Sequence, residues 1–96
     1  MEEISEIKAY AKENSVPIMQ DAGIDFICDY IKNNDIHSVL EIGTAIGYSS
    51  IRFARLSKDI HVTTIELDID RHIKAVENFK ASGLAKPFMA KISSKL

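Results

Sequence analysis

Two acidic residues and a short glycine loop have types and spacing that could support chemistry. Glu41 lies within a short apolar run, and Gly43 and Gly47 follow that run closely. Glu66 closes the next apolar run, about 20 positions after Gly47. A glycine loop before a helix presents backbone N–H groups to a carboxylate or phosphate, and an acidic residue at this distance can accept hydrogen bonds from both ribose hydroxyls. The spacing predicts a site for a ribonucleoside with an anionic or zwitterionic group.

The loop differs from the dinucleotide-binding pattern G-x-G-x-x-G. Ala45 stands at the second glycine, and Gly47 comes too early for the third. Glu41 would repel a pyrophosphate but would attract an ammonium group. S-adenosylmethionine carries an ammonium group for Glu41, a carboxylate for the loop and a ribose for Glu66. It is therefore the favoured ligand, and a module for a nicotinamide or adenosine-phosphate nucleotide is the alternative.

The elements around the loop alternate between strand and helix patterns. A short apolar run predicts a first strand that is covered on both faces, and the residues before Glu66 predict a second strand. Asp70 is the expected N-cap of the helix that follows, with Ile73 on its apolar face and Gly83 at its end. The predicted order is strand 38–42, helix 48–56, strand 61–66, helix 70–82 and strand 88–92.

Two helices precede these elements. Residues 2–13 and 21–33 have helical periodicity. The second segment carries an apolar stripe of Phe26, Ile27, Tyr30 and Ile31, widened by Ile24 and Cys28. Alternating strands and helices imply βαβ units on a parallel sheet. The predicted fold class is α/β, the N-terminal part of a Rossmann-like doubly wound parallel sheet preceded by two helices.

Composition limits the functional classes. The chain has 96 residues, with 12 basic and 14 acidic side chains, so no excess positive charge favours duplex nucleic acid or an anionic membrane. No apolar run approaches the roughly 20 residues that span a bilayer. The start Met1-Glu2-Glu3 is acidic, unlike a secretory signal, and one cysteine cannot form an internal disulfide. We expect a cytoplasmic protein with no membrane partner.

The residues from Val39 to Ser49 resemble the first cofactor motif of the class I S-adenosylmethionine-dependent methyltransferases. Within that class they are most similar to the metal-dependent O-methyltransferases of the catechol and caffeoyl-CoA type. Residues 64–68 resemble the second motif, and residues 16–19 resemble the N-terminal lid. At the most specific level, the sequence resembles bacterial enzymes that methylate 5-hydroxyuridine at the wobble position of tRNA.

The resemblance implies a role for each residue around the cofactor. Glu41 would lie near the methionine ammonium, Glu66 would hold the ribose hydroxyls, and Leu67 would pack on the adenine. The remaining cofactor-binding positions are the loop residues Gly43, Thr44, Ala45 and Gly47, the helix-opening residues Tyr48 and Ser49, and the lid residues Val16 and Ile18. Ser49 would lie at the methionine carboxylate.

The sequence departs from the family after its second motif. The family's metal ligands are Asp and Asn residues at the ends of later strands, and residues 88–94 stand where Gly-Asp-Ala is expected. We therefore assign no catalytic residue and no metal ligand, and expect Mg²⁺ only in a full-length enzyme. The expected organisation is a partial methyltransferase domain, with a lid region over 1–35, a cofactor-binding core over 36–84 and a truncated end over 85–96.

The resemblance implies an S-adenosylmethionine-dependent O-methyltransferase that acts on a small-molecule hydroxyl or on wobble hydroxyuridine in tRNA. Arg52, Arg55 and Lys58 are candidate contacts for the RNA phosphates. A non-catalytic fragment that is stable only with a partner subunit is the main alternative, and a homodimer stays open. Glu66 could also be a solvated strand end, and Glu41 could have a purely structural partner.

Overall fold

A small parallel sheet positions the glycine loop in the computed structural model, which describes residues 2–83 and 88–91. In these ranges the strands are β1 (Ser38–Ile42), β2 (His61–Glu66) and β3 (Phe88–Lys91), in the order β1-β2-β3. Ser38 pairs with His61, and Ile42 pairs with Ile65. Because the strands are parallel, the loop after β1 and the end of β2 meet at the same edge of the sheet.

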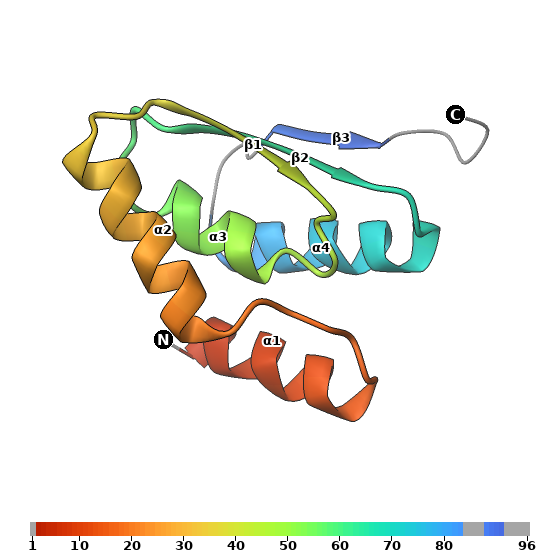
Figure 1. The fold of residues 1–96 in the computed structure, drawn as a ribbon. Coiled ribbons are helices and arrows are strands. Elements are labelled where there is room, and N and C mark those ends of the chain that lie inside the picture. Colours follow the sequence, from red (N-terminus) through yellow and green to blue (C-terminus); the bar gives the residue numbers. More distant parts are fainter. Residues whose placement is uncertain (1, 84–87, 92–96) are drawn as a thin grey trace.

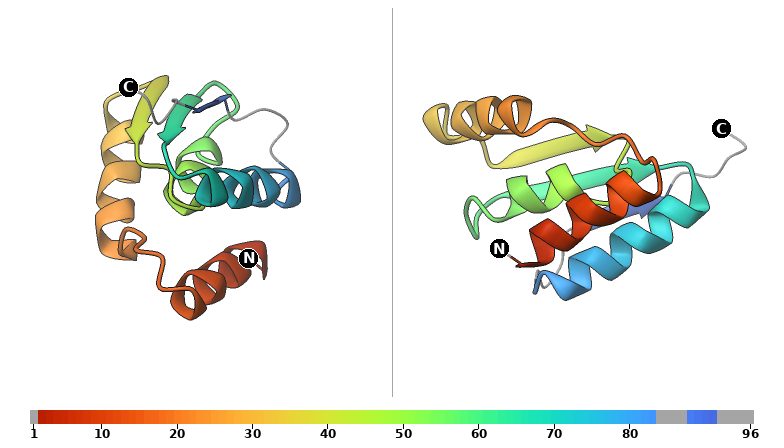
Figure 2. Two further views of the ribbon diagram at one scale, coloured as in Figure 1. Left: turned by 90° about the vertical axis from the view of Figure 1, so that its right-hand side faces the viewer. Right: turned by 90° about the horizontal axis from the view of Figure 1, so that it is seen from below.

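The helices of the described ranges all lie on one side of this sheet (Figures 1 and 2). Helices α3 (Tyr48–Ala54) and α4 (Ile69–Ala81) pack against β2, and α1 (Glu2–Glu13) lies beneath them as an outer layer. Helix α2 (Asp21–Asn33) packs against α3 on the β1 side. The predicted α/β order of helix, helix, strand, helix, strand, helix and strand is confirmed.

The hydrophobic core lies between the sheet and these helices. Its fully buried members include Ile24 of α2, Ile51 of α3 and Ala75 of α4, together with Tyr48 and Ile46 beside the loop. Burying a side chain of this size contributes about 1.5–3 kcal/mol. The loop is therefore built on the best-packed part of the chain.

The predicted apolar stripe of α2 is wrong in part. Phe26 is 72% exposed and Tyr30 is 54% exposed, whereas Ile24, Cys28 and Ile31 are buried. Both sets have helical spacing, so periodicity does not choose between them. The packing of α2 against α3 selects the second set.

The prediction that β1 is covered on both faces is also wrong for the described residues. Leu40 is 65% exposed and Ile42 is 73% exposed, whereas Val39 and Glu41 are half-buried on the helix side. Successive side chains of a strand point to opposite faces. The face that carries Leu40 and Ile42, uppermost in Figure 1, has no described helix over it.

Smaller differences concern the ends of helices and strands. The N-cap of α4 is Asp68, whose carboxylate accepts a hydrogen bond from Arg71 N at 3.0 Å, and Asp70 lies inside the helix. Asp68 has the extended backbone that an N-cap needs. Ile73 is 52% exposed because Ala75 and Phe79 form the buried face instead.

Other predicted boundaries hold or shift slightly. Helix α3 ends at Ala54 rather than at residue 56. Gly83 follows α4 with a φ of 74°, in the left-handed region that closes many helices. Strand β3 ends at Lys91, and the predicted last residue, Ile92, lies outside the described ranges. No helix in residues 2–83 and 88–91 is long and apolar enough to span a membrane.

Candidate functional site

A cavity of about 180 Å³ lies where the loop after β1 meets the connector between α1 and α2. One wall is the connector, and the other is formed by the end of β1, the loop and the start of α3. Small-molecule pockets typically measure about 300–1,000 Å³, so this cavity can enclose only part of such a ligand. Its lining residues are Pro17, Ile18, Met19, Glu41, Ile42, Gly43, Thr44, Ala45, Tyr48 and Ser49.

The loop backbone is held in an unusual conformation. Gly43 and Gly47 each have a φ of 92°, and Ala45 has a φ of 51°. Only glycine adopts this region without a steric cost. The amides of Gly43 and Thr44 both donate to the Ile65 carbonyl oxygen, at 2.8 and 3.0 Å. These bonds tie the loop to β2.

Helix α4 supports the loop from below. A Cβ atom on Gly47 would lie 2.9 Å from Cε1 of Phe79, so glycine is required there for space as well as for its φ. The buried Asn78 donates from Nδ2 to the Ile46 carbonyl oxygen at 2.7 Å. Asn78 and Phe79 therefore fix the path of the loop from Ile46 to Gly47.

Hydroxyl groups surround the carboxylate of Glu41. The hydroxyls of Ser49 and Ser50 donate to it, and Thr64 Oγ1 donates to Oε1 at 2.8 Å. A half-buried carboxylate needs such donors, and they turn Glu41 toward the cavity that it lines. A carboxylate has about four acceptor positions, so room remains for one further donor.

Glu66 joins the loop to the start of α4. Its Oε1 accepts from Ala45 N at 2.7 Å, and its Oε2 accepts from Asp68 N at 3.0 Å. The residue is only 8% exposed, so the alternative of a solvated strand end is wrong. Two of its roughly four acceptor positions are used, which leaves capacity for hydroxyl donors.

The structure brings most of the predicted site residues to the cavity. Ile18, Glu41, Gly43, Thr44, Ala45, Tyr48 and Ser49 line it. Four predicted residues are not part of the lining. Gly47 is buried against Phe79, and Glu66 contacts the lining only through Ala45. Leu67 is 59% exposed, and Val16 lines a second cavity between α1 and the start of α4.

The sequence interpretation missed several residues of the site. Pro17 and Met19 line the cavity beside Ile18, although only Val16 and Ile18 of this segment were predicted site residues. The position of these two residues in the lid-like connector was a signal that could have found them. Thr64 holds Glu41 from the next strand. The parallel register pairs Glu41 with Thr64, so aligning the two predicted strands would have indicated this contact.

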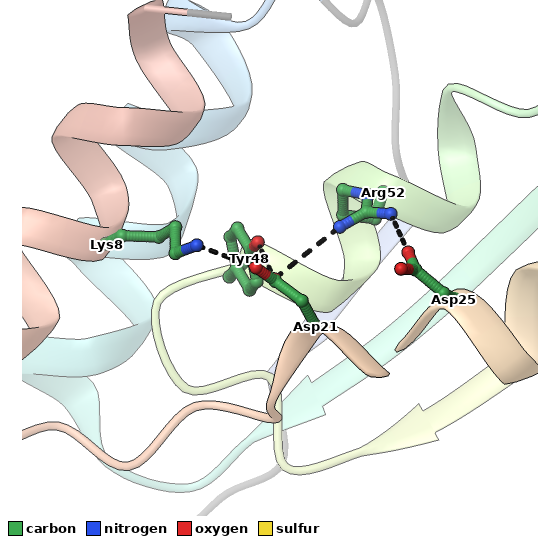
Figure 3. A network of polar contacts seen from close by, with 5 residues as sticks. All are labelled: Lys8, Asp21, Asp25, Tyr48 and Arg52. Carbon is green, nitrogen blue, oxygen red and sulfur yellow. Dashed lines mark hydrogen bonds and ion pairs between the residues drawn. The ribbon is translucent and has the colours of Figure 1, made fainter. Parts of the chain in front are cut away.

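A polar network beside the cavity joins the first three helices (Figure 3). The buried Tyr48 donates its hydroxyl to Asp21, and Lys8 Nζ lies 2.7 Å from Asp21 Oδ2. Arg52 Nη2 lies 2.6 Å from Asp25 Oδ1, and Arg52 Nη1 lies 3.7 Å from Asp21. The network thus links α1, α2 and α3 near the point where the connector meets α2.

The network changes the ionisation of its members. The hydrogen bond from Lys8, and then that from Tyr48, lower the pKa of Asp21 below its ordinary value of 3.8. Burial, and then the bond to Asp21, raise the pKa of Tyr48. The predicted basic surface is largely occupied, because Arg52 is paired with α2 and Arg55 donates to the Ser82 carbonyl oxygen at 3.0 Å.

Metal binding has no support from the described residues. Over 2–83 and 88–91, no group of three His, Cys, Asp or Glu side chains could hold a metal ion. The side chains in the described part of the chain do not fit a divalent-metal site.

Comparisons with known proteins identify the architecture. No family model matches the sequence. A Staphylococcus aureus protein assigned as a caffeoyl-CoA O-methyltransferase has 38% identity and a TM-score of 0.85 over 95% of this chain. A Bacillus cereus O-methyltransferase solved with S-adenosylhomocysteine has 23% identity and a TM-score of 0.80 over 97% of the chain. The O-methyltransferase TomG of Streptomyces achromogenes, solved with S-adenosylmethionine, has 24% identity and a TM-score of 0.80 over 97%.

These findings confirm the predicted fold and the predicted resemblance to the class I S-adenosylmethionine-dependent O-methyltransferases. The chain spans 43% of the length of each of these three proteins, and it corresponds to the N-terminal part of their fold.

The two loop glycines provide a test of the site's construction. Gly47→Ala should lower the free energy of unfolding by about 3 kcal/mol, since it adds a clash with Phe79 to the cost of a left-handed residue. Gly43→Ala meets no neighbouring atom and should cost only about 1 kcal/mol. Urea unfolding of both variants measures the difference. Equal losses would mean that Phe79 does not fix the loop.

The titration of Asp21 provides a second test. NMR of its side-chain carboxyl should give a pKa below 3.8, and Lys8→Met should move the pKa toward 3.8. Because the folded-state pKa is lowered, the stability that Asp21 contributes is present above pH 3.8 and is lost as pH falls through the folded-state pKa. Lys74→Met, which removes a lysine outside the network, should leave the Asp21 pKa unchanged. A wild-type pKa of 3.8 or higher would contradict the contact.

Proposed function

We propose that this chain forms the cofactor-binding part of an S-adenosylmethionine-dependent O-methyltransferase. The observation that carries the proposal is the cavity that Glu41 lines. The loop that forms part of its wall has residues in the left-handed backbone region, and its Ala45 amide donates to Glu66. The cavity has the size of an amino-acid group rather than of a whole nucleoside. A location in the cytoplasm, favoured by the single cysteine, belongs to the same proposal.

Each polar group of the cofactor has a candidate partner. The free acceptor position of Glu41 suits the methionine ammonium, and the loop and Ser49 suit its carboxylate. Glu66 has acceptor capacity for the ribose hydroxyls. Leu67 is exposed beside Glu66, where it can pack on the adenine ring. Val16 and Gly47 would act indirectly, through the connector and the loop.

Methyl transfer itself requires groups beyond these. The acceptor oxygen attacks the methyl carbon, the carbon–sulfur bond breaks, and its electron pair converts the sulfonium to a thioether. A base must take the hydroxyl proton, and no described residue beside the cavity is assigned that role. We propose a small-molecule hydroxyl rather than tRNA wobble hydroxyuridine as the acceptor, since Arg52 and Arg55 are engaged within the protein and the net charge is −2.

Calorimetry with S-adenosylhomocysteine tests this proposal. The wild-type chain should bind, and Glu66→Gln should bind about tenfold more weakly because it loses a charged acceptor. Glu77→Gln, an exposed acidic residue of α4, should bind like wild type. No heat with the wild type, or equal affinity for Glu66→Gln, would contradict the proposal. Tighter binding of NAD than of S-adenosylhomocysteine would favour the nucleotide-binding alternative.

A second candidate is a non-catalytic fragment that is stable only with a partner subunit. The exposed face of β1 favours it, because Leu40 and Ile42 lie uncovered on a parallel sheet, and parallel sheets are normally covered on both faces. β1 also lies at an edge of the described sheet, where its backbone can pair with a further strand. A partner would add a strand beside β1 and cover this face.

Thermal unfolding at several concentrations separates the two candidates. If a partner is required, the isolated chain should lack a cooperative transition at low concentration and should associate as its concentration rises. Leu40→Asn should reduce that association, whereas Phe26→Asn, equally exposed but on α2, should not. A cooperative unfolding transition of the monomeric wild-type chain would contradict the need for a partner.

A further inference from the structure

The connector between α1 and α2 forms one wall of the cavity, but hydrogen bonds hold it only at its two ends. Backbone hydrogen bonds flank the connector, from Val16 N to Ala11 O and from Ile24 N to Gln20 O. The connector residues that line the cavity are Pro17, Ile18 and Met19. No hydrogen bond within the described chain includes any of them. Ile18 packs against the hydrophobic core, so the position of these residues depends on that packing and on the elements at the two ends.

Asp21 is the contact that fixes the second of these ends. It is the first residue of α2, directly after the connector, and its carboxylate accepts from Tyr48 on α3 and pairs with Lys8 on α1. Figure 3 shows its carboxylate beside the Tyr48 side chain, with dashed lines to Lys8 and Arg52. Three helices meet at this one side chain.

Tyr48 contacts Asp21 and also lines the cavity. Its side chain lines the cavity and is only 2% exposed, while its hydroxyl donates to Asp21. Hydrogen bonds to an ionised acceptor are roughly twice as strong as those between neutral groups. This hydrogen bond thus joins the wall formed by the loop and α3 to the first residue of α2, where the connector ends.

We propose that Asp21, held by Tyr48 and Lys8, is a positioning residue that keeps the connector in place over the cavity and so sets the affinity for the methionine part of the cofactor. This inference rests on the proposed function. A wall that is already in place lowers the cost of ordering it when a ligand binds. Asp21 does not line the cavity, so it acts through the connector and Tyr48.

Asp25 provides a matched control on the same helix. Its ion pair with Arg52 also joins α2 to α3, at 2.6 Å against 2.7 Å for Lys8 and Asp21, but it lies one turn further from the connector. Removing Asp25 breaks one contact between α2 and α3, whereas removing Asp21 breaks those with Tyr48 and Lys8 at the end of the connector. Only the loss of Asp21 should release the connector.

Two measurements on the full chain test the inference. Hydrogen exchange of the Val16 and Ile24 amides, which bond to Ala11 and Gln20 at the two ends of the connector, should be about tenfold faster without ligand in Asp21→Ala than in wild type and unchanged in Asp25→Ala. Tyr48→Phe, which removes one of the contacts of Asp21, should act in the same direction but less strongly, and adding it to Asp21→Ala should change little, because the Tyr48 hydroxyl has already lost that partner. In calorimetry, Asp21→Ala should bind S-adenosylhomocysteine about fivefold more weakly and Asp25→Ala less than twofold.

The outcomes separate this inference from the proposed function. Unchanged exchange in Asp21→Ala, or equal effects of Asp21→Ala and Asp25→Ala on exchange or on affinity, would overturn the positioning role while leaving the proposed function intact. No binding by the wild type would overturn the proposed function and the effect on affinity. The exchange measurement would still decide whether Asp21 holds the connector.

Discussion

The attachment of the glycine loop to β2 is the constraint on which the rest of the structure depends. The Ile65 carbonyl oxygen accepts from two loop amides, and the buried carboxylate of Glu66 accepts from a third, that of Ala45. These bonds hold Ala45 at a φ of 51°, which a residue with a side chain rarely adopts. Without them the loop would relax, and the cavity beside it would lose one wall.

A carboxylate surrounded by hydroxyls gives the site its chemical character. The half-buried Glu41 carboxylate receives its hydrogen bonds from side chains of α3 and β2. Glu66 is held by backbone amides instead. Both acidic residues therefore have structural partners as well as spare acceptor positions, and a structural role and a cofactor-binding role do not exclude each other. In the proposed function these groups bind the cofactor, and no described residue beside the cavity is assigned to the transfer step.

The sequence was sufficient for the elements and for the loop, because these follow from local patterns. The strand at 38–42 and the helix at 21–33 were predicted with their observed bounds. Local patterns could not show which face of α2 is buried or that Leu40 is exposed, since both depend on neighbours far apart in the sequence. The same reason hid Asp21 and Thr64, whose roles arise only when α2 meets α3 and β2 meets β1.

A crystal structure of the chain with S-adenosylhomocysteine tests the central claim most directly, because it locates every group of the ligand. Our account predicts the amino-acid end inside the cavity, with its ammonium at Glu41 and its carboxylate at the loop, and the ribose hydroxyls at Glu66. A ligand bound elsewhere on the chain, or one whose ribose lies away from Glu66, would contradict it.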